Sequence, residues 1–368
     1  MLYIVGIPIE EIKSIGVRSK INSQVDAFNR AGMDCKIVVL NLDDENNWKT
    51  KMKRIIPFIN MRKKWSIEEM VDQDYIYIRK GWESDRYANK FYTKLKKLNP
   101  KLKIVYEVPT YPYDAELSDS WKGRILLLKD RWYRRQFPSF IDRIATLTDD
   151  KEIFGVPTLK ICNGIDLEKI CPRNVRDLPD IHAIAVANFE WWHGYDRFLA
   201  GMKVYYAANP LRKIIFHLVG YGNELDRYQK MVEDYGLGEY VILHGRQTGE
   251  ALDAIYDQCN LGIASLGCYR KGMNETQELK SREYLAKGVP FVSGVKITDI
   301  PDVDKDNIYL QVPNNDSPVN IEMVLKFYDR IYREGADQVS MRLRQFAKDH
   351  FSMEVAMKEV IDFFQNGK

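Results

Sequence analysis

The sequence predicts an α/β protein with two doubly wound domains in tandem, each built on a largely parallel sheet covered by helices on both faces. Short apolar runs alternate with longer stretches of helical periodicity, the pattern typical of parallel sheets. This series starts at the first residues and starts again near residue 181. The length of 368 residues, with 45% hydrophobic and 29% charged side chains, allows each domain a core of its own.

The first half of the chain alternates expected strands and helices. Residues 19–32 place Ile21, Val25 and Phe28 at helical spacing, and a second helix is expected at 84–98. The expected strands of this half are 1–7, 36–41, 74–80, 102–108 and 142–148.

The second half repeats the pattern after a linker at 171–180, which contains two prolines among charged residues. We therefore expect a first domain at 1–172 and a second at 173–344, with a helix at about 345–366 that crosses back to the first domain. Expected helices are 195–208 and 223–238, and expected strands are 182–188, 213–222, 240–245, 261–267 and 290–294.

Composition narrows the class of protein. The net charge of +3 does not argue for a nucleic-acid partner. Five cysteines without a CxxC motif indicate reduced thiols and a cytoplasmic location. The N-terminal residues do not read as a signal peptide, and no apolar run reaches the length that spans a membrane.

Ligands of open parallel sheets bind beyond the carboxyl ends of the strands, where the N-termini of helices also lie. Several segments of interest follow expected strands in this way. They are Gly16, residues 107–114, 188–194 and 220–222, Gly245 with Arg246, and residues 274–292.

The stretch NETQELKSREYLAKGVPFV, residues 274–292, carries two glutamates, Glu275 and Glu283, eight positions apart. A helix that starts near Glu278 offers free backbone N–H groups and a positive dipole end to an anion. Glu283 lies about one turn further on, where its carboxylate can accept hydrogen bonds from two vicinal hydroxyls, as on a ribose. Glu275 precedes the helix and meets another part of the ligand. An anion between polyhydroxyl groups describes a nucleotide sugar.

This stretch resembles the E-x7-E motif of retaining GT-B glycosyltransferases, especially family 4. In that family the first glutamate approaches the transferred sugar and the second binds the donor ribose, and Glu275 and Glu283 occupy those places. Residues 144–170 resemble the segment before the family's second domain, with its NG(I/V)D sequence, and residues 217–247 resemble its LVGxG unit. Residues 105–116 and Gly16 extend the likeness more loosely into the first half.

The resemblance implies the GT-B fold, in which two Rossmann-like domains face each other across a cleft. The first domain then takes the acceptor and the second takes the donor. The candidate catalytic residues are Glu275 and Glu107, which follows the strand LKIVY. The candidate donor-binding residues are Glu283, Gly16, Arg18, Asn188, His193, Gly220, Gly222, Arg246, Glu278, Leu279 and Lys280.

The chain departs from the family where two cations usually clamp the donor pyrophosphate. Asn188 stands at the place of an arginine and His193 at the place of a lysine. The clamp is therefore weakened, or it has moved to one of four other cations. A phosphate could also protonate His193, because the pKa of histidine is near neutral. The other candidate cations are Lys280, Arg282, Arg246 and Arg18.

Helix amides and basic side chains can stabilise a departing nucleoside diphosphate without a metal. We expect no metal and no cofactor besides a UDP- or GDP-sugar. The DVD sequence at 302–304 matches a metal-binding DxD pattern, but it reads better as a surface turn.

Residues 120–140 mix aromatic and aliphatic side chains with six basic ones. Such a segment can lie in a membrane interface, and it can equally form an ordinary amphipathic helix packed on its own domain. It follows the expected acceptor loop, so a lipid-linked acceptor would be presented there.

The leading hypothesis is a retaining, metal-independent hexosyltransferase that moves a sugar to a glycan or a lipid-linked acceptor. The expected setting is surface polysaccharide or glycoconjugate biosynthesis at the inner face of the plasma membrane. A nucleotide-sugar epimerase of the same fold and a non-catalytic scaffold remain open alternatives. A dinucleotide-dependent dehydrogenase is disfavoured, because no GxGxxG follows the first strand of either half.

Overall fold

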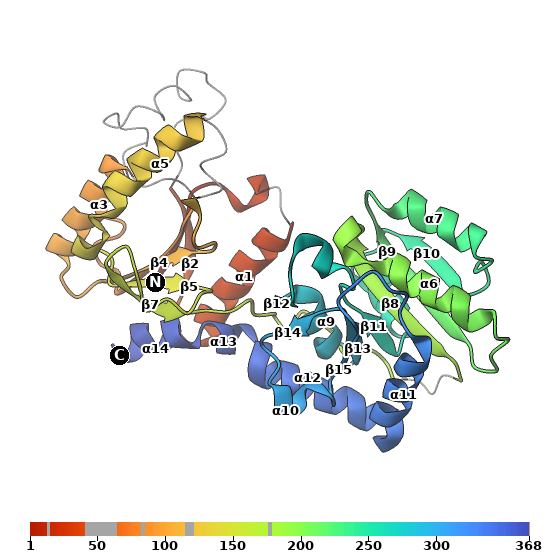
Figure 1. Cartoon of the computed structure of the whole chain (residues 1–368). Coiled ribbons are helices and arrows are strands. Elements are labelled where there is room, and N and C mark those ends of the chain that lie inside the picture. Colours follow the sequence, from red (N-terminus) through yellow and green to blue (C-terminus); the bar gives the residue numbers. More distant parts are fainter. Residues whose placement is uncertain (13–14, 41–64, 82–84, 115–120, 176–178, 368) are drawn as a thin grey trace. The chain divides into compact units, whose positions relative to one another are not determined.

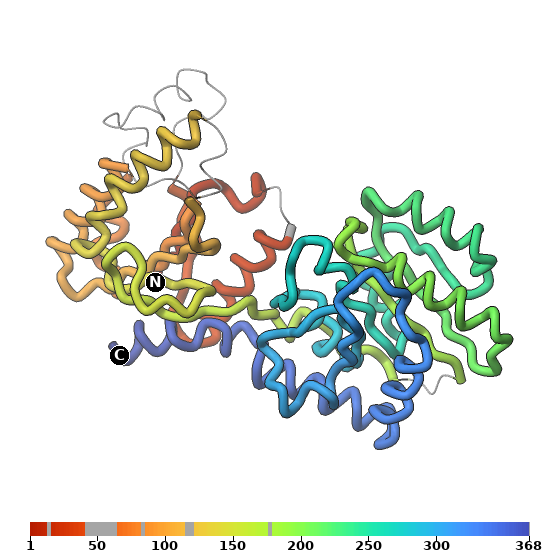
Figure 2. Tube along the Cα trace, in the orientation of Figure 1, coloured from red at the N-terminus to blue at the C-terminus, as the bar shows by residue number. Residues whose placement is uncertain are grey.

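The computed structural model describes residues 1–12, 15–40, 65–81, 85–114, 121–175 and 179–367 (Figures 1 and 2). They form two compact units. Unit 1 comprises residues 1–164 and 353–368, and unit 2 comprises residues 165–352. Each unit is an α/β structure on a parallel sheet, which confirms the predicted fold class.

The boundary between unit 1 and unit 2 lies directly after Gly164, earlier in the chain than the expected residue 172. The segment that read as a linker is fastened to unit 2 by backbone hydrogen bonds. The N–H of Arg173 donates to the carbonyl of Lys287 at 3.1 Å, and the N–H of Asn174 donates to the Asp257 carboxylate at 2.7 Å. Proline and charge are common in linkers, but here Arg173 and Asn174 belong to unit 2.

Unit 1 contains a sheet in the order β2-β1-β3-β4-β5-β7-β6, in which only the β6–β7 pair is antiparallel. Side chains alternate between its faces, as the two-residue period of a strand requires. Tyr3 and Val5 pack with α1, whereas Leu2 and Ile4 pack with α3 on the opposite face. The strands are β1 (Leu2–Val5), β2 (Lys36–Val39), β3 (Tyr75–Arg79), β4 (Lys103–Val108), β5 (Arg143–Thr146), β6 (Glu152–Ile153) and β7 (Val156–Lys160).

The end of the chain returns to unit 1 and completes its core. The Phe364 ring lies 6.2 Å from the Phe28 ring and 5.0 Å from the Tyr75 ring. The Lys103 ammonium donates to the carbonyls of Phe363 and Phe364 and so binds the carboxyl end of α14. The helical elements of unit 1 are η1 (Ile9–Glu11), α1 (Ile15–Arg30), α3 (Arg86–Leu98), α5 (Trp121–Arg134), η2 (Phe137–Ser139), α13 (Met353–Ala356) and α14 (Lys358–Asn366).

Unit 2 contains a parallel sheet in the order β10-β9-β8-β11-β13-β15. The order reverses between β8 and β11, so these neighbours mark the topological switch point of a doubly wound sheet. A separate two-stranded pair joins β12 to β14. The strands are β8 (Ile181–Asn188), β9 (Ile214–Tyr221), β10 (Val241–Gly245), β11 (Leu261–Ile263), β12 (Glu275–Thr276), β13 (Phe291–Ser293), β14 (Lys296–Ile297) and β15 (Tyr309–Gln311).

Helices cover both faces of this sheet and bury it. Phe198 of α6 packs on Phe216 of β9, with ring centres 4.8 Å apart, and the Tyr284 ring of α9 lies against Gly262 of β11. The helical elements are η3 (Trp191–His193), α6 (Tyr195–Tyr206), α7 (Leu225–Asp234), α8 (Glu250–Tyr256), η4 (Cys268–Lys271), α9 (Leu279–Ala286), α10 (Asp302–Lys305), α11 (Ile321–Ile331), η5 (Tyr332–Glu334) and α12 (Ala336–Phe351). Helix α12 thus belongs to unit 2, and the return to unit 1 begins at Met353, later than the expected residue 345.

Gly201 allows α6 to approach the segment before α11 closely. A Cβ atom at this position would lie 2.2 Å from the carbonyl oxygen of Val319. Gly201→Ala should therefore destabilise the protein by about 1–3 kcal/mol, although alanine favours a helix more than glycine does. The free energy of unfolding in urea checks this. Gly238→Ala is the control, because nothing lies within 4 Å of its Cβ position. Equal stability of both variants would contradict the close contact.

Candidate functional site

The candidate site of unit 2 lies at the carboxyl ends of β8 and β11, where the loops after the two strands touch. The N–H of Leu266 donates to the carbonyl of His193 at 2.8 Å. Gly194 has a φ of 66°, and a Cβ atom there would lie 2.4 Å from the backbone nitrogen of Gly267. Only glycine allows this approach, so the contact fixes both loops at the place where doubly wound sheets bind ligands.

Helix α9 begins at the same place, because Glu278 ties its start to the end of β11. The Glu278 carboxylate accepts hydrogen bonds from the N–H of Ser265 at 3.2 Å and from its hydroxyl at 2.7 Å. Strand β11 ends at Ile263, before the expected residue 267. Glu278 is therefore engaged within the protein, whereas Leu279 beside it is 44% exposed.

Lys280, on the first turn of α9, contacts side chains that come from the ends of both strands. Its Nζ lies 3.3 Å from Ser265 Oγ and 3.4 Å from Tyr195 Oη. Desolvation lowers the pKa of Lys280, and the nearby Glu278 carboxylate acts against this effect. The side chain places an ammonium group where β8, β11 and α9 meet.

His193 is buried and lies against the Tyr195 ring, with ring centres 5.6 Å apart. Its Nδ1 accepts a hydrogen bond from the N–H of Glu190 at 3.1 Å, so the proton of the neutral ring lies on Nε2. Desolvation, Lys280 and Lys271 together lower the pKa of His193 to about 3. The protein itself thus favours the neutral form of His193, and protonation of this ring by a phosphate stays a prediction.

Glu190 lies in the segment 188–194 that the sequence singled out, but it was not among the predicted site residues. Its carboxylate accepts hydrogen bonds from Asn188 Nδ2 at 3.2 Å and from Asn223 Nδ2 at 3.1 Å. It thus joins the ends of β8 and β9 and places a negative charge beside the position where the family carries an arginine. The only signal in the sequence is its place just after an expected strand.

The two glutamates of the E-x7-E pattern are both exposed to solvent. Glu275 lies in β12, where the strand pairs with β14 opposite Lys296. Glu283 lies on α9. Desolvation raises the pKa of its carboxyl, and the positive charges of Lys280 and Lys287 act against this effect. Neither carboxylate has a hydrogen-bond partner among the described residues, so both are accessible to a ligand.

Of the other candidate cations in unit 2, Arg282 has a structural role, whereas the role of Arg246 stays a prediction. Arg282 is buried, forms an ion pair with Asp299 and lies over the Phe351 ring. Arg246 is exposed beyond β10, with its guanidinium 5.6 Å from the Tyr221 ring centre. Helical phase therefore turns Lys280 toward the site and Arg282 away from it.

Gly220 and Gly222 are required by contact between neighbouring strands. Their φ values are 140° and 139°, and Cβ atoms would lie 1.8 Å from the carbonyl oxygen of Ala187 and 2.5 Å from the backbone of Phe189. The close approach of β9 to β8 thus accounts for both glycines without a ligand.

In unit 1, Glu107 is fully buried at the end of β4. It accepts hydrogen bonds from Tyr77 Oη at 3.0 Å and from Arg79, and Lys20 Nζ lies 3.9 Å away. Because the carboxylate has no exposed surface, the interpretation of Glu107 as a residue that touches substrate is wrong. It holds Arg79 and Lys20 in place instead.

Gly16 and Arg18 lie on the first turn of α1 in unit 1. Gly16 is exposed and Arg18 is half-buried. Both residues belong to unit 1, and their predicted role in donor binding stays a prediction.

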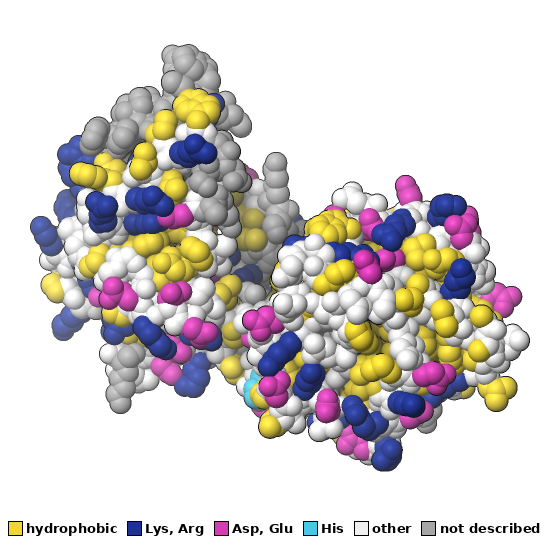
Figure 3. Space-filling view, viewed as in Figure 1, with side chains coloured by type: hydrophobic (Ala, Val, Ile, Leu, Met, Phe, Trp, Pro, Cys, Tyr) yellow, Lys and Arg dark blue, Asp and Glu magenta, His cyan; other side chains and the backbone are white. Residues whose placement is uncertain are grey.

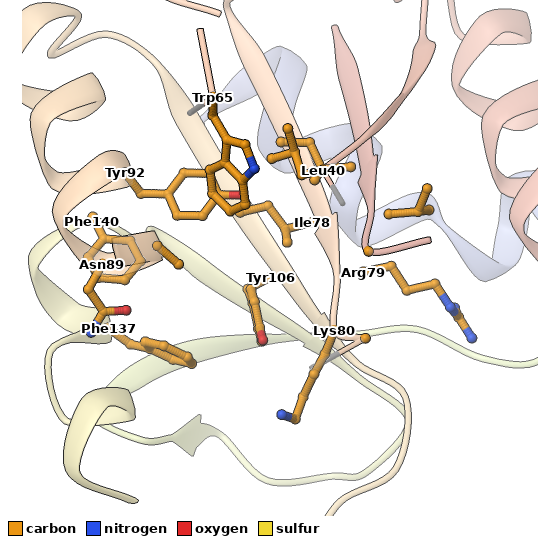
Figure 4. A pocket seen from close by; sticks show the side chains of 15 residues that line it. Leu40, Trp65, Ile78, Arg79, Lys80, Asn89, Tyr92, Tyr106, Phe137 and Phe140 are labelled. Carbon is orange, nitrogen blue, oxygen red and sulfur yellow. The ribbon is translucent and has the colours of Figure 1, made fainter. Parts of the chain in front are cut away.

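A pocket of unit 1 lies at the carboxyl ends of β1 and β3, where the strand order of this sheet also reverses. It has about 540 Å³ of empty space, part of which is open to solvent. Figure 4 shows aromatic side chains that converge on it from several elements, with the polar end of Lys80 at one side. These aromatic residues are Trp65, Tyr92, Tyr106, Phe137 and Phe140.

The residues that the structure describes contain no cluster of three or more His, Cys, Asp or Glu side chains suited to a metal ion. The DVD sequence at 302–304 forms the start of α10 rather than a turn, and Lys296 pairs with Asp302 at 3.0 Å.

Two doubly wound parallel sheets, one in each unit and each with a switch point in its strand order, define the GT-B class of fold. Residues 168–319, most of unit 2, match the family model of glycosyl transferases group 1. A comparison with curated proteins finds no match.

Solved structures show the same fold at low sequence identity. A glycosyltransferase from Rickettsia africae is 12% identical with a TM-score of 0.60, over 100% of this chain and 98% of that one. Anabaena HepE, solved with UDP, is 11% identical with a TM-score of 0.55, over 98% of both chains. The sucrose-phosphate synthase of Thermosynechococcus elongatus is 16% identical with a TM-score of 0.53, over 97% of this chain and 96% of that one.

The lowered pKa of His193 makes stability depend on pH. Below about pH 6.5 the unfolded chain binds a proton at this residue and the folded chain does not, so stability falls as the pH drops toward 3. The slope is at most about 1.4 kcal/mol per pH unit for one histidine. In urea unfolding between about pH 5 and 7, the free energy of unfolding of His193→Gln should fall less steeply with decreasing pH than that of the wild type, by up to this slope. His350→Gln, at an exposed position, is the control. Equal slopes in wild type and His193→Gln would contradict a neutral buried ring.

Proposed function

We propose that this protein is a retaining glycosyltransferase that moves a hexosyl group from a UDP- or GDP-sugar to a glycan or a lipid-linked acceptor. The observation that supports it best is the arrangement at the switch point of unit 2. There the start of α9 and the Lys280 ammonium offer donors to an anion, and the exposed carboxylates of Glu275 and Glu283 offer acceptors to hydroxyl groups. A nucleotide sugar presents both kinds of group.

In the proposed reaction the bond between the sugar and the nucleoside diphosphate breaks through an oxocarbenium-like state, and negative charge grows on the leaving phosphate. The N-terminal amides of α9 and Lys280 stabilise that charge, which is why we propose that no metal is needed. Glu283 holds the ribose hydroxyls. Glu275 lies toward the transferred sugar, and we assign no protein nucleophile.

We propose that unit 1 takes the acceptor. The aromatic pocket at the ends of β1 and β3 supports this, since stacked rings and apolar walls suit a sugar face or an apolar chain. Lys80 at its side lies 3.6 Å from Asp130 and 4.4 Å from the Tyr113 ring centre, so its position is fixed.

We propose that α5 contacts an anionic lipid surface. Trp121, Leu128 and Trp132 share one face of this helix and are 66%, 65% and 62% exposed. Apolar rings next to basic side chains suit the boundary between lipid headgroups and acyl chains. Figure 3 shows hydrophobic and basic side chains interspersed on the side of unit 1 that α3 and α5 cover. The basic neighbours on α5 and just after it are Lys122, Arg124, Arg131 and Arg135.

The sequence has three other basic stretches, at 49–54, 61–64 and 95–98, which would add attraction to anionic lipid if they share a face. Residues 95–98 lie at the end of α3, and the stretches at 49–54 and 61–64 lie outside the described residues. No helix in the described part of the chain is both long and apolar enough to cross a membrane.

A non-catalytic scaffold is the second candidate, and one observation favours it. Asn188 replaces a cation, and the Glu190 carboxylate beside it would repel a phosphate. An epimerase of the same fold would consume the donor without an acceptor. Donor consumption that needs an acceptor supports the transferase, whereas binding without turnover supports the scaffold.

A nucleotide at about 100 times its dissociation constant should stabilise the protein by about 2.7 kcal/mol. In a thermal-shift series with UDP, GDP, ADP and their sugars, one nucleotide should raise the melting temperature, with and without EDTA. Glu283→Ala should reduce this shift, because the ribose loses its acceptor. Glu239→Ala, an exposed glutamate elsewhere in unit 2, should not. No shift with any nucleotide would refute the donor site.

Vesicles with anionic phospholipid should bind the wild type and release it as the salt concentration rises. The triple variant Trp121→Ala, Leu128→Ala and Trp132→Ala should bind at least about tenfold more weakly in a flotation assay. A matched control is Leu211→Ala with Met341→Ala, which removes exposed apolar side chains from unit 2. If the triple variant floats like the wild type, the helix is an ordinary surface helix.

A further inference from the structure

Three histidines of unit 2 form a hydrogen-bonded chain across three neighbouring strands. His182 lies on β8, His217 on β9 and His244 on β10. His182 Nδ1 lies 2.9 Å from His217 Nε2, and His217 Nδ1 lies 2.9 Å from His244 Nε2. His217 is buried, whereas the two outer rings are half-buried. This histidine chain therefore joins two partly accessible imidazoles through a central ring that uses both of its nitrogens.

The register of the parallel sheet places the three rings on one face. Ile184 of β8 and Ile242 of β10 both lie opposite His217. His182 precedes Ile184 by two residues and His244 follows Ile242 by two, so their side chains share the face of His217. The histidine chain thus runs obliquely from the start of β8 to the end of β10, and the fold itself holds the rings in contact.

The two contacts limit how many protons the histidine chain can hold. Each contact takes one proton, because one nitrogen donates and the other accepts. Three neutral rings carry three protons, two in the contacts and one on an outer nitrogen. A fourth proton fits on the remaining outer nitrogen, and His217 then donates to a ring that stays neutral. A fifth proton has to enter a contact that is already filled, so that contact breaks.

Few charges act on the three rings. Burial lowers the pKa of each ring, to about 3 at His217, where the two neighbouring rings contribute as well. The Asp180 carboxylate, just before β8, acts against this effect on the pKa of His182. No other charged side chain of the described residues shifts the pKa of these rings. The strands β8, β9 and β10 themselves carry no Asp, Glu, Lys or Arg.

The charged groups of the adjoining segments are paired or exposed. On α8, which links β10 to β11, Asp253 pairs with Lys287, and Asp257 accepts a hydrogen bond from the N–H of Asn174. A positive charge on the histidine chain is therefore favoured by a carboxylate only at the end where His182 lies. The exposed charged neighbours are Lys213 before β9, Glu239 before β10, Arg246 after β10 and Glu250 at the start of α8.

We propose that the histidine chain is an acid-sensitive latch, which holds β10 to the sheet while it carries at most one excess proton and releases the strand when a second proton arrives. Strand β10 lies at the edge of its sheet and pairs with β9 alone among the described strands, so no second strand compensates for a broken contact. The strand leads directly into Arg246, at the ligand-binding edge of the sheet, so acidity acts on that edge. This inference is independent of the proposed function.

NMR titration of protein with isotope-labelled histidine rings tests the limit of one excess proton. In the wild type, His182 and His244 should titrate in two steps at least about one pH unit apart, because the first charge disfavours the second. In His217→Leu they share no ring, and the lower midpoint should rise by about the same amount. His244→Gln, at a half-buried position, should leave His182 with a single step and guards against a folding defect of the buried variant. His350→Gln, at an exposed position, is the control and should change neither midpoint.

Hydrogen exchange of the backbone amides tests the release of β10. After correction for the intrinsic pH dependence, exchange in residues 241–245 of the wild type should rise relative to β13 by roughly tenfold per pH unit below the second step, as one linked proton requires. In His217→Leu this excess should vanish. Wild-type midpoints that coincide, or that keep their separation in His217→Leu, would overturn the inference, and so would equal pH dependence of exchange in β10 and β13. None of these measurements involves a nucleotide, so the proposed function stands or falls separately.

Discussion

The site of unit 2 depends on one backbone contact, the approach of Gly194 to Gly267 at the ends of β8 and β11. No side chain separates the two loops there, so each loop fixes the other. His193 and Tyr195 flank the first glycine, and Ser265 precedes the second by two residues. The polar groups that face a ligand are therefore positioned by rigid main chain, which is the condition under which preorganised electrostatics act in catalysis.

Charge at this site is arranged differently from the pattern that the family resemblance implies. The ends of β8 and β9 carry Glu190 with two asparagines, and the cation stands on α9 instead. A histidine with a strongly lowered pKa cannot supply a charge near neutral pH, but it can donate a hydrogen bond without attracting water as an ion does. The neutral donor, His193, thus lies on η3, whereas the cationic donor, Lys280, lies on α9.

The two-sheet architecture could be predicted from the sequence, because apolar runs of strand length, such as 181–188 and 214–221, are typical of strands buried in a parallel sheet. It singled out Glu275 and Glu283 because their spacing is local, and their roles stay predictions. It could not find Glu190, or the engagement of Glu278 by Ser265, because those contacts join segments that are distant in the chain. Glu107 was misjudged for the same reason, since Tyr77 and Arg79 on a neighbouring strand bury it.

The return of residues 353–368 to unit 1 sets the order in which the chain can mature. Phe364 belongs to the core of unit 1, yet in the sequence it follows the whole of unit 2. Unit 2 is complete in sequence before that core can close, and closing it joins chain ends separated by the whole of unit 2. The N-terminal part of unit 1 must therefore wait, partly open, until the segment after unit 2 has been made, and it is exposed to chaperones and proteases during that interval.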